Sequence, residues 1–398
     1  MMTAHWLAWC LVAQLLPTGP IELARGTVTV SGDVTGTFGA RDETAFFNYT
    51  DYENNALRMF RVSISGLWRP TDHFAFVTEI RSEDLQRLIP YALYARVRPW
   101  TNRAFDIQVG RIPPVFGAFG RRSYSTDNPL IGYPLAYQYL TSIRPDAIPA
   151  TADDLLFMRG RGWRATYPVG SLQPAPGVPL ISAYRWDTGV EAHGTAGIFD
   201  LSGAVTVGTL SNPRVSDDNN GRQFSGRLAA TPVVGLVLGV SAAHGAFLVR
   251  SLADQFGNGG KNNFPQDAIA ADAEYSRGYW MLRGEAIWNS WHLPLIAAPY
   301  ITDPLRADSA YVETRYRFTP RYFAAARADA LRFSKITGVR FFSGQPTSWD
   351  APVTRVEVGG GVYLQRNLTL RGIVQRNWRD GGRVRDKTYL SAQISYWF

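Results

Sequence analysis

Arginine is the residue type in this sequence with the clearest chemical potential. Of the 41 basic residues only Lys261, Lys335 and Lys387 are lysine, and the others are arginine. A guanidinium group holds carboxylate or phosphate through two parallel hydrogen bonds. The arginines are spread along the chain instead of being gathered in one patch or tail, so we expect no nucleic-acid partner. Their distribution points to an extended polar surface that can interact with anions.

The residues that catalysis would need are sparse. The chain has five histidines, which are scattered and lack the spacing of metal ligands. It has no Gly-x-Ser-x-Gly motif, and the run 217–221 lacks the ligand spacing and the closing glutamate of a calcium loop. We therefore predict no enzymatic activity, no metal site and no cofactor.

The arginines alternate with apolar residues, as the side chains of a β-strand do. In the stretch 309–318, Glu313, Arg315 and Arg317 occupy alternate positions, that is, one parity and hence one face of a strand. Mostly apolar or aromatic residues occupy the other parity. The final stretch shows the same period of two, and its apolar face ends in Phe398. Each such strand would separate a polar environment from an apolar one.

The composition argues against a bundle of membrane helices. The chain of 398 residues has a mean hydropathy of -0.15. No run approaches the roughly 18 to 20 apolar residues that a spanning helix requires. A closed β-barrel instead hides its apolar surface in alternation and pairs every backbone group. The sequence thus predicts an all-β fold, namely a transmembrane antiparallel up-and-down β-barrel.

The alternating segments predict about eighteen strands, with sixteen as the alternative. Short connections alternate with long ones, as in barrels that have short periplasmic turns and long extracellular loops. The longest connection is the third on the long side, residues 111–157. Two of the predicted strands, 158–167 and 180–186, follow it along the chain.

The first residues have the character of a secretion signal. An apolar run over 5–16 is followed by Pro17 and Gly19, which predicts a signal peptide over residues 1–24. Its removal would leave 25–398 as a single barrel without cysteine, a composition compatible with the envelope of a Gram-negative bacterium.

The polar parity of the strands predicts which side chains line the lumen. Basic residues exceed acidic ones modestly on this face, and rings of basic side chains favour anions. The alternative is that most of these arginines pair with acids on neighbouring strands and only line a wet wall. The predicted pore-lining arginines are Arg61, Arg81, Arg96, Arg98, Arg164, Arg227, Arg283, Arg315, Arg317, Arg327, Arg355 and Arg371. The predicted pore-lining acids are Glu79, Asp106, Asp272, Glu274, Glu285, Glu313, Asp329 and Glu357.

The connection 111–157 is too apolar to lie wholly in water, and long ordered loops are usually functional. Its run Pro114-Val115-Phe116-Gly117 resembles the Pro-x-Phe-Gly motif in the inward-folded third loop of general porins. The resemblance implies a water-filled channel that this loop narrows, although Val115 stands where porins carry an acidic residue. The predicted constriction residues are Arg111, Pro114, Phe116, Gly117, Arg121, Arg122, Tyr124 and Asp127.

The C-terminal strand resembles the last strand of bacterial outer-membrane barrels, which typically ends in phenylalanine. The resemblance implies an outer-membrane location, surrounding lipid, and recognition of Phe398 by the barrel assembly machinery. We therefore expect a porin through which small hydrophilic or anionic solutes diffuse passively. The resemblance also admits a homotrimer.

Other functions also fit the pattern. A structural or scaffold barrel would share the strands but would not conduct. Tyr124, Tyr133, Tyr137 and Tyr139 would suit an aromatic track for sugar rings, as in maltoporin-like channels, or they would pack the loop against the wall. An arginine-lined barrel would also suit export of an acidic polysaccharide, as in alginate-exporter-like proteins.

Overall fold

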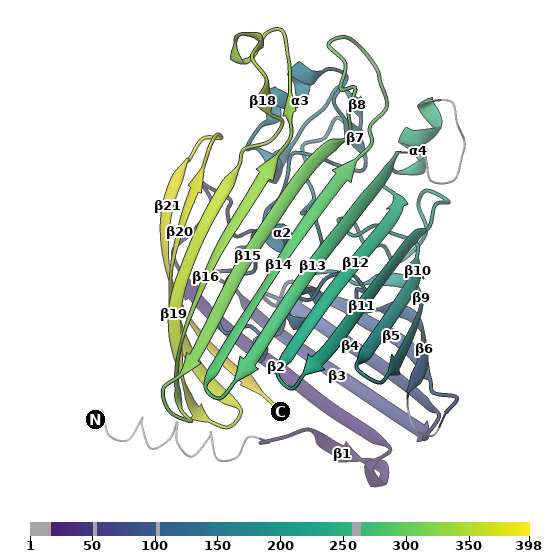
Figure 1. The fold of residues 1–398 in the computed structure, drawn as a ribbon, viewed down its shortest axis with the longest axis vertical. Helices are drawn as coiled ribbons and strands as arrows, with labels where there is room; N and C mark the ends of the chain where they lie inside the picture. Colours follow the sequence, from purple (N-terminus) through teal and green to yellow (C-terminus); the bar gives the residue numbers. More distant parts are fainter. Residues whose placement is uncertain (1–16, 51–53, 101–103, 257–263) are drawn as a thin grey trace.

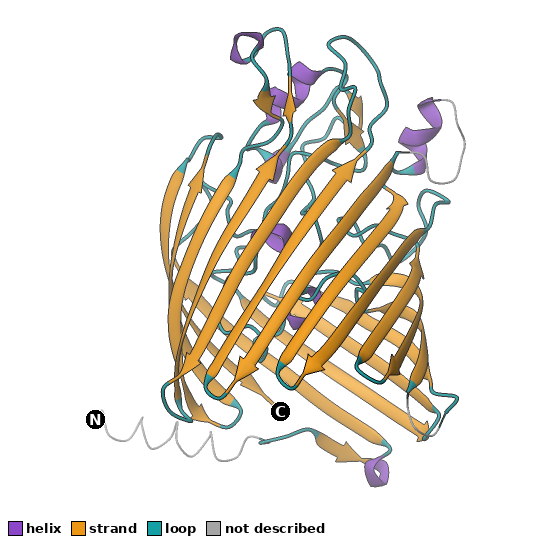
Figure 2. Ribbon diagram, viewed as in Figure 1, coloured by secondary structure: helices purple, strands orange, loops and turns teal. Residues whose placement is uncertain are grey.

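The chain forms one closed β-barrel (Figure 1, Figure 2). The computed structural model describes residues 17–50, 54–100, 104–256 and 264–398, so most of the predicted signal peptide lies outside the described residues. Sixteen antiparallel strands of the described chain form the wall, each paired with its neighbours in chain order. They are β2 (Val28–Gly39), β3 (Phe60–Thr71), β4 (Phe74–Glu83), β5 (Leu88–Val97), β6 (Phe105–Ile112), β9 (Asp187–Ala196), β10 (Phe199–Thr206), β11 (Gln223–Val233), β12 (Leu236–Ala246), β13 (Pro265–Arg277), β14 (Trp280–Trp291), β15 (Leu305–Arg317), β16 (Tyr322–Phe333), β19 (Val353–Gln365), β20 (Leu368–Arg379) and β21 (Asp386–Trp397).

Smaller elements lie outside the wall. None of the helices in the described ranges is both long and apolar enough to cross a membrane. The helical turns are η1 (Ala24–Gly26), η2 (Gly120–Arg122), α2 (Leu135–Gln138), α3 (Ala152–Met158), η3 (Gly162–Arg164), α4 (Arg250–Ala253), η4 (Asp254–Phe256) and η5 (Phe342–Gly344). The short strands are β1 (Ile21–Leu23), which pairs with β2, β7 (Ala147–Ile148) with β8 (Val169–Gly170), and β17 (Lys335–Ile336) with β18 (Thr347–Ser348).

The wall has an apolar outer face because side chains alternate along each strand. In β20, Arg371 and Gln375 are buried on the lumen side, whereas Leu370 and Val374 face outward and are exposed. The same alternation recurs along β13 and β14. The predicted all-β antiparallel barrel is therefore confirmed, with the outward surface that such barrels present to lipid.

Exposed aromatic residues gather near both ends of the strands, as in the two interfacial girdles of membrane barrels. Near the end that holds the chain termini they are Trp68, Phe199, Trp280, Phe318 and Tyr322. Near the opposite end they are Phe38, Phe60, Phe224, Trp288 and Trp378.

The last strand closes the barrel by pairing with β2. The register sets Val34 opposite Tyr396. The backbone N–H of Phe398 donates to the carbonyl oxygen of Gly32 at 3.0 Å, and the N–H of Gly32 donates back at 3.1 Å. A Cβ atom at Gly32 would force the ring of Phe398 to move, so glycine lets the ring pack closely against β2. The terminal strand consequently has a paired edge.

The connections differ in length between the two ends of the barrel. Those at the end with the termini are 72–73, 98–104, 197–198, 234–235, 278–279, 318–321 and 366–367. Those at the opposite end, called here the loop end, are 40–59, 84–87, 113–186, 207–222, 247–264, 292–304, 334–352 and 380–385. Apart from 84–87 and 380–385, every loop-end connection is longer than any connection at the other end.

The predicted count of eighteen strands is wrong, and the alternative of sixteen is correct. The segments 158–167 and 180–186 lie inside one connection, 113–186, because Ile112 at the end of β6 pairs directly with Asp187 at the start of β9. Four prolines between the two segments lack the N–H that a strand ladder needs. The apolar residues of these two segments are buried within a loop, and the segments are not part of the barrel wall.

Candidate functional site

The connection 113–186, called here the inner loop, enters the barrel lumen. Figure 1 shows α2 within the outline of the barrel and α3 above the loop-end rim. Nearly every residue from 128 to 148 is buried. The lumen is therefore the place where this long segment buries its side chains, which explains its apolar composition.

The start of the inner loop is fixed to two wall strands. The N–H of Gly117 donates to the hydroxyl of Ser241 on β12 at 3.1 Å, and the N–H of Ala118 donates to Glu285 on β14 at 2.8 Å. Gly117 has a φ of +72°, and a Cβ atom there would collide with Glu285, so the turn requires glycine. Phe116 is fully buried beside it. The motif that resembles porins thus forms a tight inward turn.

The next residues of the inner loop bind acidic groups of the wall. Arg121 forms an ion pair with Glu191 at 2.7 Å, and Arg122 forms one with Glu274. The hydroxyl of Tyr124 donates to Glu79 at 2.7 Å. These partners lie on β9, β13 and β4, so this part of the inner loop spans the lumen between separate parts of the wall.

Two further contacts complete this part of the inner loop. The guanidinium group of Arg283 donates to the carbonyl oxygen of Asp127 at 3.1 Å. The Nε atom of Arg121 donates to the carbonyl oxygen of Pro114 at 3.2 Å. The side chain of Arg121 remains 45% exposed, which makes it a solvent-accessible charge among the predicted constriction residues.

A buried charge cluster centred on Arg327 holds the middle of the inner loop. Its guanidinium group contacts Glu313 at 3.1 Å, Asp329 at 3.2 Å and Glu357 at 3.0 Å. It also donates to the carbonyl oxygen of Gly132 at 2.7 Å. Glu357 in turn accepts the N–H of Gly132 at 2.9 Å. The backbone of the inner loop at Gly132 therefore forms hydrogen bonds with both a basic and an acidic side chain of the wall.

Two more wall arginines bind inner-loop carbonyl groups. Arg355 donates to the carbonyl oxygen of Tyr133 at 3.1 Å and to that of Phe47 at 2.8 Å. Arg371 donates to the carbonyl oxygen of Ser125 at 2.7 Å. Because a guanidinium group carries five donors, one side chain can bridge a wall strand to separate loop segments. These arginines hold the loop segments against the wall.

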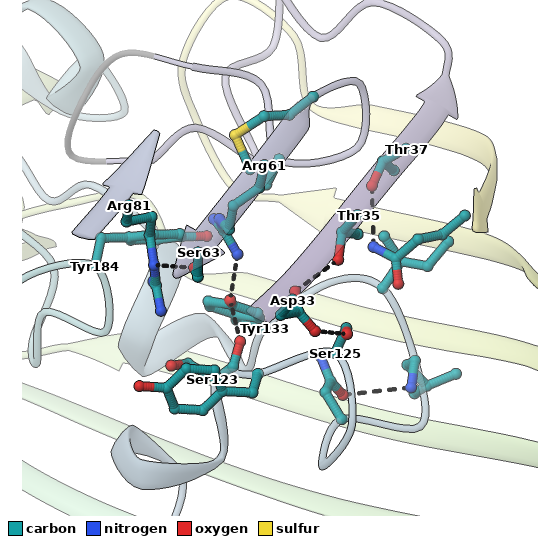
Figure 3. Close-up of a pocket in the computed structure, with 17 residues that line it drawn as sticks. Asp33, Thr35, Thr37, Arg61, Ser63, Arg81, Ser123, Ser125, Tyr133 and Tyr184 are labelled. Atoms are coloured by element: carbon teal, nitrogen blue, oxygen red, sulfur yellow. Dashed lines mark hydrogen bonds between the residues drawn. The ribbon is translucent and has the colours of Figure 1, made fainter. Parts of the chain in front are cut away.

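Small hollows lie beside this packed segment. One, shown in Figure 3, has a volume of about 30 Å³, which leaves room for one or two water molecules. Arg61 donates to the hydroxyl of Tyr133 at 3.0 Å across it, and Arg81 donates to the hydroxyl of Ser63 at 3.2 Å. Asp33 accepts a hydrogen bond from Ser125 at 2.5 Å. Polar groups from wall and loop thus meet here with little space between them.

The lumen at the loop end is filled by an apolar core that sequence reasoning missed. The rings of Trp291 and Trp349 lie 6.0 Å apart, and those of Phe333 and Trp349 lie 4.7 Å apart. Tyr139 of the inner loop packs against Phe333 at 6.5 Å. The available signal was parity, because Trp291 falls on the same face of β14 as Arg283. The lumen-facing side of that strand changes from charged to apolar toward the loop end.

The connection 40–59 also packs into the lumen through a buried carboxyl group. Asp42 accepts the backbone N–H of Asn48 at 2.7 Å and the hydroxyl of Tyr389 on β21. Burial raises the pKa of Asp42 to about 6 even though these hydrogen bonds favour the ionised form. Phe47 is fully buried against Tyr389, with ring centroids 6.5 Å apart.

The wall places most predicted pore-lining residues in buried contacts and not along an open channel. The buried ones are Arg81, Arg283, Arg327, Arg355, Arg371, Glu79, Asp106, Asp272, Glu285, Glu313, Asp329 and Glu357. The partly exposed ones are Arg61, Arg96, Arg98, Arg227, Arg315, Arg317 and Glu274. Many of these arginines form ion pairs with acids on the inner wall, which is the alternative that the sequence left open.

Two predicted site residues lie elsewhere. Arg111 belongs to β6 and not to the connection, because β6 continues to Ile112; its Nε donates to the carbonyl oxygen of Trp186 at 3.1 Å. Arg164 lies in η3 at the loop end and is exposed, because the strand predicted for it does not form. Arg111 is thus a residue of the wall, and Arg164, predicted to line the pore, lies outside the wall strands.

Three of the four tyrosines considered for a sugar track are used for packing, and the fourth, Tyr124, is partly exposed. Tyr133, Tyr137 and Tyr139 are buried. The hydroxyl of Tyr137 donates to Glu285 at 2.8 Å, and the ring of Tyr133 stacks on Tyr184 with centroids 5.1 Å apart. Their faces are occupied by protein, so the packing interpretation is the one that the structure supports.

Comparison with known proteins places this architecture among outer-membrane barrels. No protein-family model matches the sequence, and no curated protein matches it. An anion-selective porin from Comamonas acidovorans superposes with a TM-score of 0.56 at 11% identity, covering 93% of this chain and 99% of that chain. OmpF of Salmonella typhi, in a complex with daunomycin, gives 0.55 at 12% identity, covering 95% and 100%. A loop L8 deletion mutant of OmpT, an outer membrane protein of Vibrio cholerae, gives 0.53 at 12% identity, covering 94% and 99%.

The chain therefore has the fold of a bacterial outer-membrane porin. Its closed sixteen-strand wall and apolar outer surface are those of this class, which resides in the outer membrane.

Proposed function

We propose that the protein is a restrictive outer-membrane channel of the porin class, through which small hydrophilic solutes diffuse passively. The observation that carries this proposal is the inner loop, bonded inside the lumen to strands around the wall. A barrel of sixteen strands has a lumen wide enough for an aqueous path unless protein fills it. Here the inner loop sets the size of solute that passes.

The packing of the lumen supports a narrow channel. The apolar core around Trp291 and Trp349 fills the loop end, and the hollow beside Arg61 is only about 30 Å³. Solutes therefore pass only where the inner loop and the wall separate. We expect a unitary conductance well below that of a barrel with an empty lumen.

The charge of the lumen near the termini supports a preference for anions. Arg315 and Arg317 lie at that end of β15, and neither forms an ion pair within the described ranges. The acids deeper in the lumen already have basic partners, such as Glu313 with Arg283 at 2.6 Å. Unbalanced guanidinium groups at a pore mouth raise the local concentration of anions.

The difference between the two ends supports an orientation. We assign the end with the short connections, β1 and Phe398 to the periplasm and the loop end to the exterior, as in bacterial barrels generally. Phe398 would then be presented on the periplasmic side, where barrel assembly begins.

A second function, that of a closed structural barrel, is favoured by the same apolar core. Trp291 and Trp349 are completely buried, as in the interior of a soluble protein. Such a barrel would present loops at the surface without a conducting path.

Bilayer recordings separate the two functions. The purified protein is reconstituted in planar bilayers with a gradient of potassium chloride, and the reversal potential is measured. We expect small unitary events with a reversal potential that indicates anion preference. The double variant Arg315→Glu and Arg317→Glu should shift the reversal potential toward cation preference.

A matched double variant, Arg277→Glu and Arg321→Glu, controls for net charge. Both side chains are exposed at the same end of the barrel: Arg277 lies on the outward face of β13, and Arg321 lies in the connection 318–321. The control should retain the original reversal potential. Complete absence of unitary events from folded protein would instead establish the closed barrel.

A further inference from the structure

Four connections meet at the loop end and enclose a hollow, called here the rim vestibule. They are 40–59, the inner loop, 334–352 and 380–385. The vestibule has a volume of about 700 Å³. This lies in the range of about 300 to 1,000 Å³ that small-molecule sites occupy. It is separate from the packed lumen and from the predicted constriction residues.

Aromatic side chains form one part of its lining. The rings of Phe157 and Phe341 lie 5.7 Å apart, and Phe46 stacks on Trp163 at 3.9 Å with planes inclined by 8°. Phe157 and Phe342 are each 46% exposed although they lie in polar surface loops. Exposed ring faces in a concave site offer stacking surface to a planar apolar group.

Five arginines also line the vestibule, and two of them hold the loops together. Arg159 forms an ion pair with Asp380 at 3.1 Å. Arg379 donates to the carbonyl oxygen of Ala45 at 3.1 Å and to that of Val384 at 2.8 Å. These two guanidinium groups therefore serve the structure of the vestibule itself.

The other three arginines of the lining remain available. Arg161, Arg383 and Arg385 are exposed, and none of them forms an ion pair within the described ranges. Arg161 lies over the ring of Phe157, with its guanidinium carbon 4.6 Å from the ring centroid. The acidic residue of the lining is Glu43, which faces Arg41 at 3.7 Å. The vestibule thus carries positive charge without a matching number of acids.

The vestibule is built on fixed segments. The carboxylate of Asp153 in α3 accepts backbone N–H groups of Val339 at 3.0 Å, Arg340 at 3.1 Å and Phe341 at 3.2 Å. Burial opposes ionisation of Asp153, but these N–H groups hold its pKa below the usual range. The aromatic wall from 334–352 is thereby tied to the inner loop. A preorganised site loses less entropy when a ligand binds.

We propose that the rim vestibule binds an organic anion that carries an aromatic ring. The ring stacks among Phe157, Phe341 and Phe342, and the acidic group is held by Arg161, Arg383 and Arg385. Aromatic faces and guanidinium groups recognise the two halves of one such molecule, whereas neither half alone satisfies the site. This binding does not depend on conduction, so its test is independent of the proposed channel function.

Isothermal titration calorimetry in non-ionic detergent tests the proposal with 2-naphthoate as the probe. Titration into empty micelles is subtracted, and the neutral analogue 2-naphthalenemethanol and acetate are titrated in parallel. We expect saturable binding of 2-naphthoate and much weaker binding of both analogues. The double variant Arg161→Glu and Arg383→Glu should weaken binding by about tenfold or more, since it removes charge-assisted hydrogen bonds to the acidic group and adds repulsive charge.

The control variant Arg277→Glu and Arg321→Glu carries the same change in net charge at the opposite end of the barrel. It should change the affinity by less than about twofold, because distant exposed charges are screened. Phe157→Leu should also weaken binding while leaving the arginines in place. Equal affinity for 2-naphthoate and its neutral analogue, no saturable binding to folded protein, or equal weakening in the control would each overturn the proposal.

Discussion

At the scale of single residues, Arg327 connects the wall to the inner loop. It contacts Glu313, Asp329 and Glu357 and is completely buried. Glu313 has a second basic partner in Arg283, whereas Asp329 and Glu357 form ion pairs only with Arg327 within the described ranges. Removing one partner of a buried charge cluster costs more than the pairing itself contributes, because the remaining charges stay desolvated.

Arg327→Gln should therefore destabilise the folded barrel by about 3 kcal/mol or more. The measurement is urea unfolding in detergent micelles. Arg332→Gln, an exposed position of the same strand, is the matched control and should change the free energy of unfolding by less than about 0.5 kcal/mol. Equal effects of the two changes would show that the cluster is not a major contributor.

The sequence predicted which face of the strand most wall arginines occupy, but it did not predict their hydrogen-bond partners. Parity alone indicated that Arg327, Arg355 and Arg371 point into the lumen, and the structure agrees. Their partners are backbone carbonyl groups of segments such as 128–133, far away in the chain. Any carbonyl group can accept such a bond, so the amino-acid types left no signal of it.

At the scale of elements, the connection 40–59 is anchored by Asp42. Its folded-state pKa of about 6 lies above the ordinary value, so the folded protein binds a proton more tightly than the unfolded chain does. The corresponding stabilisation is present below pH of about 4 and is lost as pH rises through about 6. The tertiary contact of this connection with β21 should thus weaken toward neutral pH.

Asp42→Asn isolates this effect, because the amide keeps a hydrogen-bond acceptor but does not titrate. Between pH of about 4 and 8, the free energy of unfolding of the original protein should fall by roughly 3 kcal/mol more than that of the variant. Urea unfolding at several pH values measures the difference. Parallel pH profiles would show that Asp42 is not the responsible group.

Element prediction worked where alternation reflected the wall and failed where it reflected the lumen. The stretch 309–318 and the final stretch were predicted as strands, and they correspond to β15 (Leu305–Arg317) and β21 (Asp386–Trp397). The segments 158–167 and 180–186 were predicted as strands, but residues 180–184 are buried without interruption inside the inner loop. A loop folded into a barrel meets protein on both sides, and sequence periodicity does not separate that setting from a wall strand.

At the scale of the whole molecule, the barrel combines a packed lumen with an open vestibule at its loop end. The inner loop contributes to both, since residues near Gly132 bind the wall and residues near Arg161 line the vestibule. The vestibule arises from four connections that are distant in sequence, so no single motif predicted it. The central claim is that the inner loop restricts passage through a wall that is otherwise wide enough to conduct.

Replacing the inner loop tests this claim most directly. Ile112 and Asp187 are paired in register, so a two-residue Asn-Gly turn can replace residues 113–186 and close β6 and β9 as a hairpin. Barrel folding is checked by the shift in electrophoretic mobility on heating. In planar bilayers the unitary conductance of the shortened barrel should be several times that of the full chain. A folded variant whose conductance equals that of the full chain would contradict the account.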